Sequence, residues 1–118
     1  MLRLPRVTMW ACVTILAVAF VLVGISKLKD PSAMRWKERF AHWGYPPSAQ
    51  YVVGILEVLA GLGLLIAKSR RAAAATLIAL MIGALLTHLV NAEPLRLIPP
   101  LVLGGLALLV YLWRPSAL

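Results

Sequence analysis

The stretch YVVGILEVLAGLGLLIA, residues 51–67, is apolar throughout except for one carboxylate, Glu57. It predicts a membrane-spanning helix, because a span needs about 20 predominantly apolar residues and a helix satisfies its own backbone hydrogen bonds in lipid. An acidic side chain at the centre of such a helix costs roughly 2.5–3.5 kcal/mol, so Glu57 is expected to face other helices and to have a polar partner. Gly54, Ala60 and Gly61 share its helical face, which favours close approach of a second helix.

The composition extends this interpretation to the whole chain. Of its 118 residues, 62% are hydrophobic and only 14% are charged, against roughly 25% charged residues in soluble domains. A soluble domain of this size could not bury so many apolar side chains. The net charge is +8, but the basic residues cluster between apolar runs, where they anchor helices to lipid headgroups. We therefore expect the lipid bilayer, and no nucleic acid, as a partner.

Four apolar runs predict an all-α fold: one transmembrane domain, residues 1–118, built as an integral membrane four-helix bundle. The runs cover residues 7–26, 50–67, 72–90 and 97–112. The first run resembles the core of a signal peptide, but it continues to Ile25 and ends in Lys27 and Lys29, which favours a retained span. The last run is short, so tilt or local thinning of the bilayer is expected.

The connection after the first run predicts a short amphipathic helix over residues 31–43. Pro31 is typical of a helix start, and Gly44 is typical of a helix end. One face of this helix would carry the apolar residues Ala33, Trp36, Phe40 and Trp43. The helix then either lies along the membrane surface or forms a lid on the ends of the bundle, and the two interpretations are compatible.

Polar residues collect in one half of the predicted bundle. Glu57 lies about 10 Å inside the side of the membrane that carries the long connection, because alternating helices return to the same side. The first run ends on that side at Lys27, and the third ends there near His88. Thr87 and Asn91 complete the polar set, whereas the opposite half is Leu, Ala and Val. These five residues are the candidates for binding a ligand or a proton; no catalytic residue and no metal site are expected.

The spacing leaves the partner of Glu57 open. A neutral Glu57 hydrogen-bonded to His88 and an ion pair that includes Lys27 both fit the sequence. The third run also carries Ala75, Ala79, Gly83 and Thr87 at i+4 spacing, which predicts a tight helix crossing.

Membrane orientation is only weakly specified, because Lys and Arg divide six to six between the two sides. The basic turn over residues 68–71 and the terminal amine share one side, and three of the four acidic residues lie on the other. We therefore expect both termini to be cytoplasmic.

Four segments carry a resemblance to a known family: GISKL at residues 24–28, FAHWGYP at 40–46, GILEVLAGLGLLI at 54–66 and MIGALLTHL at 81–89. The sequence resembles the DoxX-like membrane proteins. The resemblance implies a four-helix bundle in the bacterial inner membrane, with Lys27, Glu57 and His88 at the polar positions of the family. Relatives in that family include a subunit associated with thiosulfate-to-quinone electron transfer, parts of membrane oxidoreductase complexes, and eukaryotic assembly factors and cargo receptors.

Three functions follow from these observations. The first is a non-catalytic accessory or assembly subunit that binds a partner protein, a quinone or a lipid around Glu57 and His88, in connection with a redox system. It is favoured because nothing in the sequence resembles a dinucleotide or iron–sulfur motif. The second is a proton-coupled carrier of a small solute, which in so short a chain would need a homo-oligomer to enclose a path. The third is a structural scaffold whose polar residues fix helix register.

Overall fold

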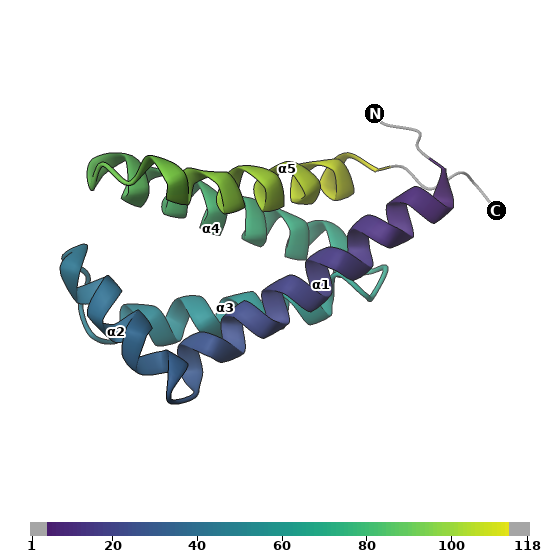
Figure 1. The fold of residues 1–118 in the computed structure, drawn as a ribbon. Coiled ribbons are helices and arrows are strands. Elements are labelled where there is room, and N and C mark those ends of the chain that lie inside the picture. Colours follow the sequence, from purple (N-terminus) through teal and green to yellow (C-terminus); the bar gives the residue numbers. More distant parts are fainter. Residues whose placement is uncertain (1–4, 114–118) are drawn as a thin grey trace.

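The computed structural model describes residues 5–113, and this part of the chain is all-α, as the sequence predicts. Figure 1 shows the elements in their order. They are α1 (Arg6–Leu28), α2 (Ser32–His42), α3 (Ala49–Gly63), α4 (Arg70–Val90), the short 3-10 helix η1 (Pro94–Leu97) and α5 (Ile98–Leu112). Three helical segments are long and apolar enough to cross a membrane: α1, α4, and η1 together with α5.

The helix α3 is apolar but shorter than the run that predicts it. The run extends to Ala67, whereas the helix ends at Gly63. The hydroxyl of Ser69 donates a hydrogen bond to the Gly63 carbonyl at 2.8 Å, and Arg70 Nε donates one to the Leu64 carbonyl at 2.8 Å. Side chains of the basic turn thus satisfy carbonyls that the end of a helix leaves free, and the chain reverses early.

The helices form two antiparallel pairs, α1 with α3 and α4 with α5 (Figure 1). The pairs converge where α1 begins and α5 ends, and they diverge toward the end that carries α2. The converging half holds the apolar core, in which Met9, Leu16 and Phe20 of α1 pack with Leu77 of α4 and Val110 of α5. The polar groups lie at the other, diverging end, so one half of the bundle is polar and the other apolar, as the sequence indicates.

Two glycines set the contact between α1 and α3. A Cβ added to Gly24 would lie 2.7 Å from the Gly54 carbonyl oxygen, and one added to Gly54 would lie 2.9 Å from that of Gly24. Only glycine permits backbones to approach this closely. The small residues around Glu57 therefore admit a neighbouring helix, as predicted: Gly54, Ala60 and Gly61 are all buried.

The small-residue stripe on α4 does not form the tight crossing that its spacing predicts. Ala75, Ala79 and Gly83 are exposed, and a Cβ added to Gly83 would meet no atom within 4 Å. The helix instead buries a neighbouring face, that of Ala73, Ala74, Leu77 and Met81. Larger side chains such as Leu77 bury more apolar surface than the stripe can, so α4 presents them to the core.

The aromatic face of α2 turns inward. Phe40 is buried, and its ring centroid lies 6.2 Å from that of Trp36, 5.4 Å from that of Trp43 and 5.7 Å from that of Tyr45. Gly44 ends the helix with a left-handed φ of +87°, and the Tyr45 amide donates to the Phe40 carbonyl at 3.0 Å. The helix therefore acts as a lid over the diverging end of the bundle.

Candidate functional site

Glu57 is paired with Lys27. The Lys27 ammonium donates a hydrogen bond to Glu57 Oε1 at 2.7 Å, and the two residues are only 4% and 2% exposed. Lys27 is in the last turn of α1 and Glu57 in the middle of α3, and the Gly24–Gly54 contact brings these helices together. The ion pair is thus the arrangement that the structure adopts, because a buried charge requires a partner.

Trp36 of α2 adds a second contact to this cation. Lys27 Nζ lies 4.0 Å from the centroid of the Trp36 ring, within the range of a cation–π interaction. The ring is held in place because Trp36 Nε1 donates to Ser26 Oγ at 2.9 Å. The guanidinium of Arg39 lies 5.0 Å from the same ring.

Gln50 is a further polar residue of the site that was not among the five candidates. It is fully buried, and its Nε2 donates to the carbonyls of Lys27 and Ala33, both at 3.0 Å. These bonds hold the end of α1 and the start of α2 against α3. The signal in the sequence was a side-chain amide at the beginning of an apolar run, on the same side of the membrane as Glu57.

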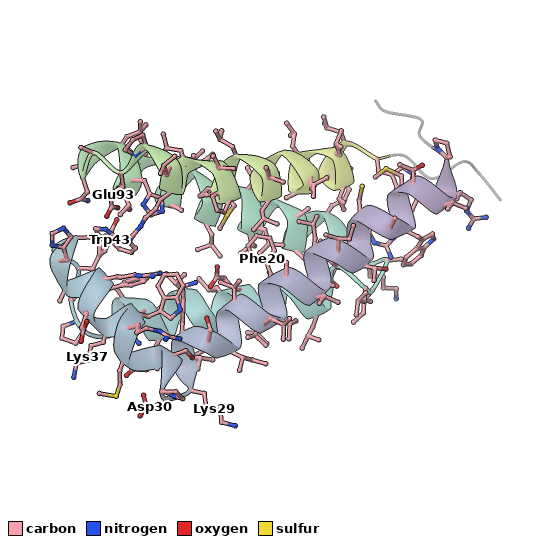
Figure 2. All side chains as sticks on the ribbon, in the orientation of Figure 1. Phe20, Lys29, Asp30, Lys37, Trp43 and Glu93 are labelled. Atoms are coloured by element: carbon pink, nitrogen blue, oxygen red, sulfur yellow. The ribbon has the colours of Figure 1, made fainter. Side chains whose placement is uncertain are left out.

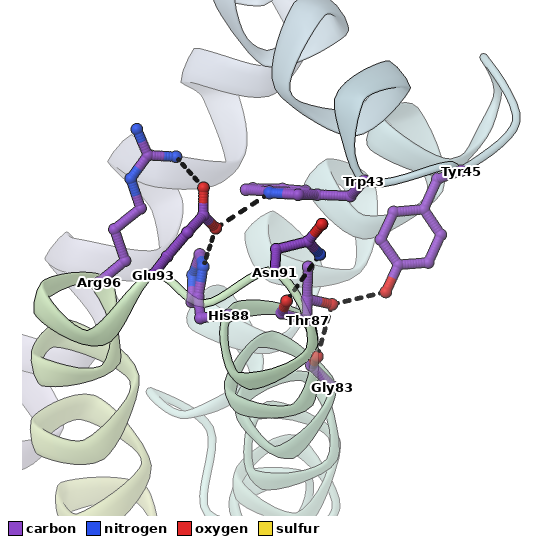
Figure 3. Close-up of polar contacts among 8 residues, drawn as sticks. All are labelled: Trp43, Tyr45, Gly83, Thr87, His88, Asn91, Glu93 and Arg96. Atoms are coloured by element: carbon purple, nitrogen blue, oxygen red, sulfur yellow. Dashed lines mark hydrogen bonds and ion pairs between the residues drawn. The ribbon is translucent and has the colours of Figure 1, made fainter.

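His88 pairs with Glu93 and not with Glu57. Figure 3 shows Glu93 at the centre of a group: its Oε1 lies 2.9 Å from His88 Nδ1 and accepts a bond from Trp43 Nε1 at 3.0 Å, and its Oε2 accepts one from Arg96 at 3.3 Å. The hydrogen bond from His88, followed by that from Trp43 and by the charge of Arg96, holds the pKa of Glu93 below its ordinary value. In the sequence, Glu93 is only one of the three acidic residues assigned to that side of the membrane.

The two remaining candidates take part in local hydrogen bonds (Figure 3). The hydroxyl of Thr87 donates to the Gly83 carbonyl at 2.8 Å and bonds to the hydroxyl of Tyr45. Asn91 Nδ2 donates to the Thr87 carbonyl at 2.8 Å, a bond within the end of its own helix. Together with the bond from Trp43 to Glu93, the Tyr45–Thr87 contact joins the lid to α4 and the turn after it.

A cavity of about 610 Å³ lies between the diverging pairs, beneath α2. Its volume falls within the roughly 300–1,000 Å³ of small-molecule sites. Apolar side chains from four helices form most of the wall: Phe20, Val23, Val53, Leu80, Met81 and Leu103. Four of the five candidates, Glu57, His88, Lys27 and Thr87, also line it, whereas Asn91 does not. Ala79 and Gly83 line it too and are exposed, so the cavity opens to the outside of the bundle along α4.

Within residues 5–113 no three His, Cys, Asp or Glu side chains lie close enough together to hold a metal ion.

The family model described as the DoxX-like family matches residues 11–110 of the chain. No curated protein and no solved structure matches it significantly.

Proposed function

Because this chain belongs to the DoxX-like family of membrane proteins, we propose that it is a non-catalytic accessory or assembly subunit of the bacterial inner membrane that binds a quinone or a lipid. The observation that carries the proposal is the cavity beside Lys27 and Glu57. Its walls are mostly apolar with a few convergent polar groups, the usual character of a small-molecule site.

The route of entry supports an apolar ligand. The exposed lining residues Ala79 and Gly83 lie in the middle of α4, a helix long enough to span a membrane. In a bilayer this opening would face acyl chains rather than water. A quinone or a lipid already dissolved in the bilayer would therefore reach the cavity without crossing an aqueous phase.

The ion pair offers polar contacts to such a molecule. Lys27 uses one ammonium hydrogen on Glu57 Oε1, and an ammonium group has three hydrogens to donate. A carbonyl oxygen of a quinone or of a lipid ester can accept a second hydrogen. This role requires binding and orientation only, with no proton transfer, and both charges stay paired while the ligand exchanges.

Two neighbouring valines of α3 provide a matched test. Val53 lines the cavity, whereas Val52 is 55% exposed and lies outside it. Wild type, Val53→Phe and Val52→Phe would be purified in mild detergent, and the extracts analysed by mass spectrometry for quinones, lipids and copurifying proteins. We expect a bound apolar molecule in wild type and in Val52→Phe, and its loss in Val53→Phe with little change in melting temperature.

Two outcomes would contradict the proposal. One is an equal content of lipid and quinone in all three proteins, which would mean that the cavity holds nothing specific. The other is solute flux that depends on a pH gradient in proteoliposomes and is abolished by Glu57→Gln, which is the behaviour of a proton-coupled carrier. If all the variants changed only thermal stability, the structural scaffold would be the better description.

A further inference from the structure

The charges that line the cavity are unbalanced. Three cationic side chains, those of Lys27, Arg39 and Arg96, face one carboxylate, that of Glu57. Glu57 is occupied by Lys27 at 2.7 Å, and Arg96 lies 3.3 Å from Glu93. Arg39 has no carboxylate within 4.0 Å in the described part of the chain.

Arg39 is also held toward the cavity. Its guanidinium lies 5.0 Å from the centroid of the Trp36 ring, which itself lines the cavity. Stacking on an aromatic face fixes the plane of a guanidinium while leaving its N–H groups free to donate. The residue therefore presents several donors at the edge of an apolar site, and no side chain of residues 5–113 supplies an anion for them.

The positions of Arg39 and Arg96 indicate the orientation in which a ligand would bind. Arg39 belongs to the lid α2, and Arg96 to η1 at the beginning of α5, so both lie at the end of the bundle toward which the pairs diverge. The apolar lining residues Phe20, Met81 and Leu103 lie deeper, toward the converging half. A molecule that matches this arrangement has its charge at the membrane surface and its hydrocarbon inside.

We propose that the cavity binds an amphiphile with an acyl tail and an anionic head group, a carboxylate or a phosphate, which accepts hydrogen bonds from Arg39. This inference rests on the proposed function, since it specifies the ligand of the same cavity. It selects an acidic lipid over a quinone, because a neutral quinone would leave the excess positive charge uncompensated. Arg96 also lines the cavity, but its charge is paired with Glu93, so the unpaired cation is Arg39.

Binding of tritiated oleate to the full-length protein in mild detergent, measured by scintillation proximity, tests this proposal. The competitors are unlabelled oleate, oleoyl lysophosphatidate, methyl oleate and a ubiquinone analogue. Oleate and methyl oleate share a chain and differ in charge, so their ratio reports the head group alone. Charge-assisted hydrogen bonds predict that the acids compete roughly ten- to a hundredfold better than the ester. The stronger of the two acids identifies carboxylate or phosphate as the preferred head.

The variant Arg39→Gln should bring the acids to within a few-fold of the ester and leave competition by the ester unchanged. Lys37→Gln is the matched control, because it removes the same charge from the same helix on the side away from Trp43 and Glu93 (Figure 2). It should keep the wild-type preference.

Equal competition by oleate and methyl oleate in wild type would overturn the proposal while leaving the proposed function standing, as would better competition by the quinone analogue. An acid preference that survives Arg39→Gln would overturn it as well. Saturable binding of none of these compounds would count against both the proposal and the proposed function.

Discussion

Lys27 Nζ and Glu57 Oε1 lie 2.7 Å apart although the two residues are 30 positions apart in the sequence. The contact depends on two glycines that lie three residues before each partner, Gly24 and Gly54, where the backbones of α1 and α3 meet. This close contact between α1 and α3 thus places the two buried charges together. The cavity occupies the space that the other helix pair leaves open beside them.

Removing one member of the Lys27–Glu57 ion pair should lower the stability of the fold more than removing both members. Glu57→Gln or Lys27→Met alone leaves a buried group without its opposite charge, a change that costs about 3–5 kcal/mol in buried pairs. The double variant removes both charges and should recover much of that loss. Thermal unfolding of wild type, the two single variants and the double variant in detergent measures the coupling energy between the two residues. Single variants with the melting temperature of wild type would show that the ion pair does not stabilise the protein.

The glycine contact should tolerate no side chain. Gly24→Ala places a Cβ 2.7 Å from the Gly54 carbonyl oxygen, so α1 and α3 must separate and the melting temperature should fall. Gly83→Ala is the control on α4, since its Cβ would meet nothing within 4 Å. Because alanine favours a helix over glycine by about 1 kcal/mol, Gly83→Ala should be neutral or stabilising. A similar loss in both variants would argue against a specific contact at Gly24.

The hydrogen bonds that Glu93 accepts from His88, Trp43 and Arg96 should contribute less to stability at acidic pH. The pKa of Glu93 is lowered by the hydrogen bond from His88 first and then by Trp43 and Arg96, so its ionised form is favoured in the folded protein. A group with a lowered folded pKa adds stability above its unfolded pKa and loses it as the pH falls through the folded one. The difference in melting temperature between wild type and Glu93→Gln should therefore shrink as the pH falls below the ordinary value of 4.5. A difference that grows in acid would have the wrong sign.

In the turn that brings Glu93 to His88, replacement of Ala92 by glycine should stabilise the protein. Ala92 has a φ of +54°, and the Glu93 amide donates to the His88 carbonyl at 2.9 Å. A left-handed conformation costs a residue with a Cβ roughly 1–2 kcal/mol. Ala92→Gly should therefore raise the melting temperature by a few degrees; a fall would mean that this turn is not formed in the membrane.

The sequence was sufficient for the helical fold and for the position of the polar half. Apolar runs of the right length predict helices in lipid, and alternating direction places Lys27, Glu57 and His88 at one end. The partners were harder to predict, because rotation of α4 about its axis decides whether His88 faces Glu57. The bond from His88 to Glu93 depends on the left-handed turn at Ala92, for which an alanine gives no signal. The same rotation leaves the stripe at Ala79 and Gly83 outside the packing that its spacing predicts.

Photolabelling through methionine tests most directly whether a quinone or a lipid occupies the cavity. Met81 lines the cavity, whereas Met34 is 60% exposed on α2 and lies outside it. Cells would incorporate a diazirine analogue of methionine, and after irradiation the peptides would be searched for added mass. We predict that Met81 carries one class of apolar small molecule, that Met34 does not, and that Val53→Phe abolishes the adduct. A Met81 peptide without an adduct, or with the same lipid mixture as Met34, would contradict the account.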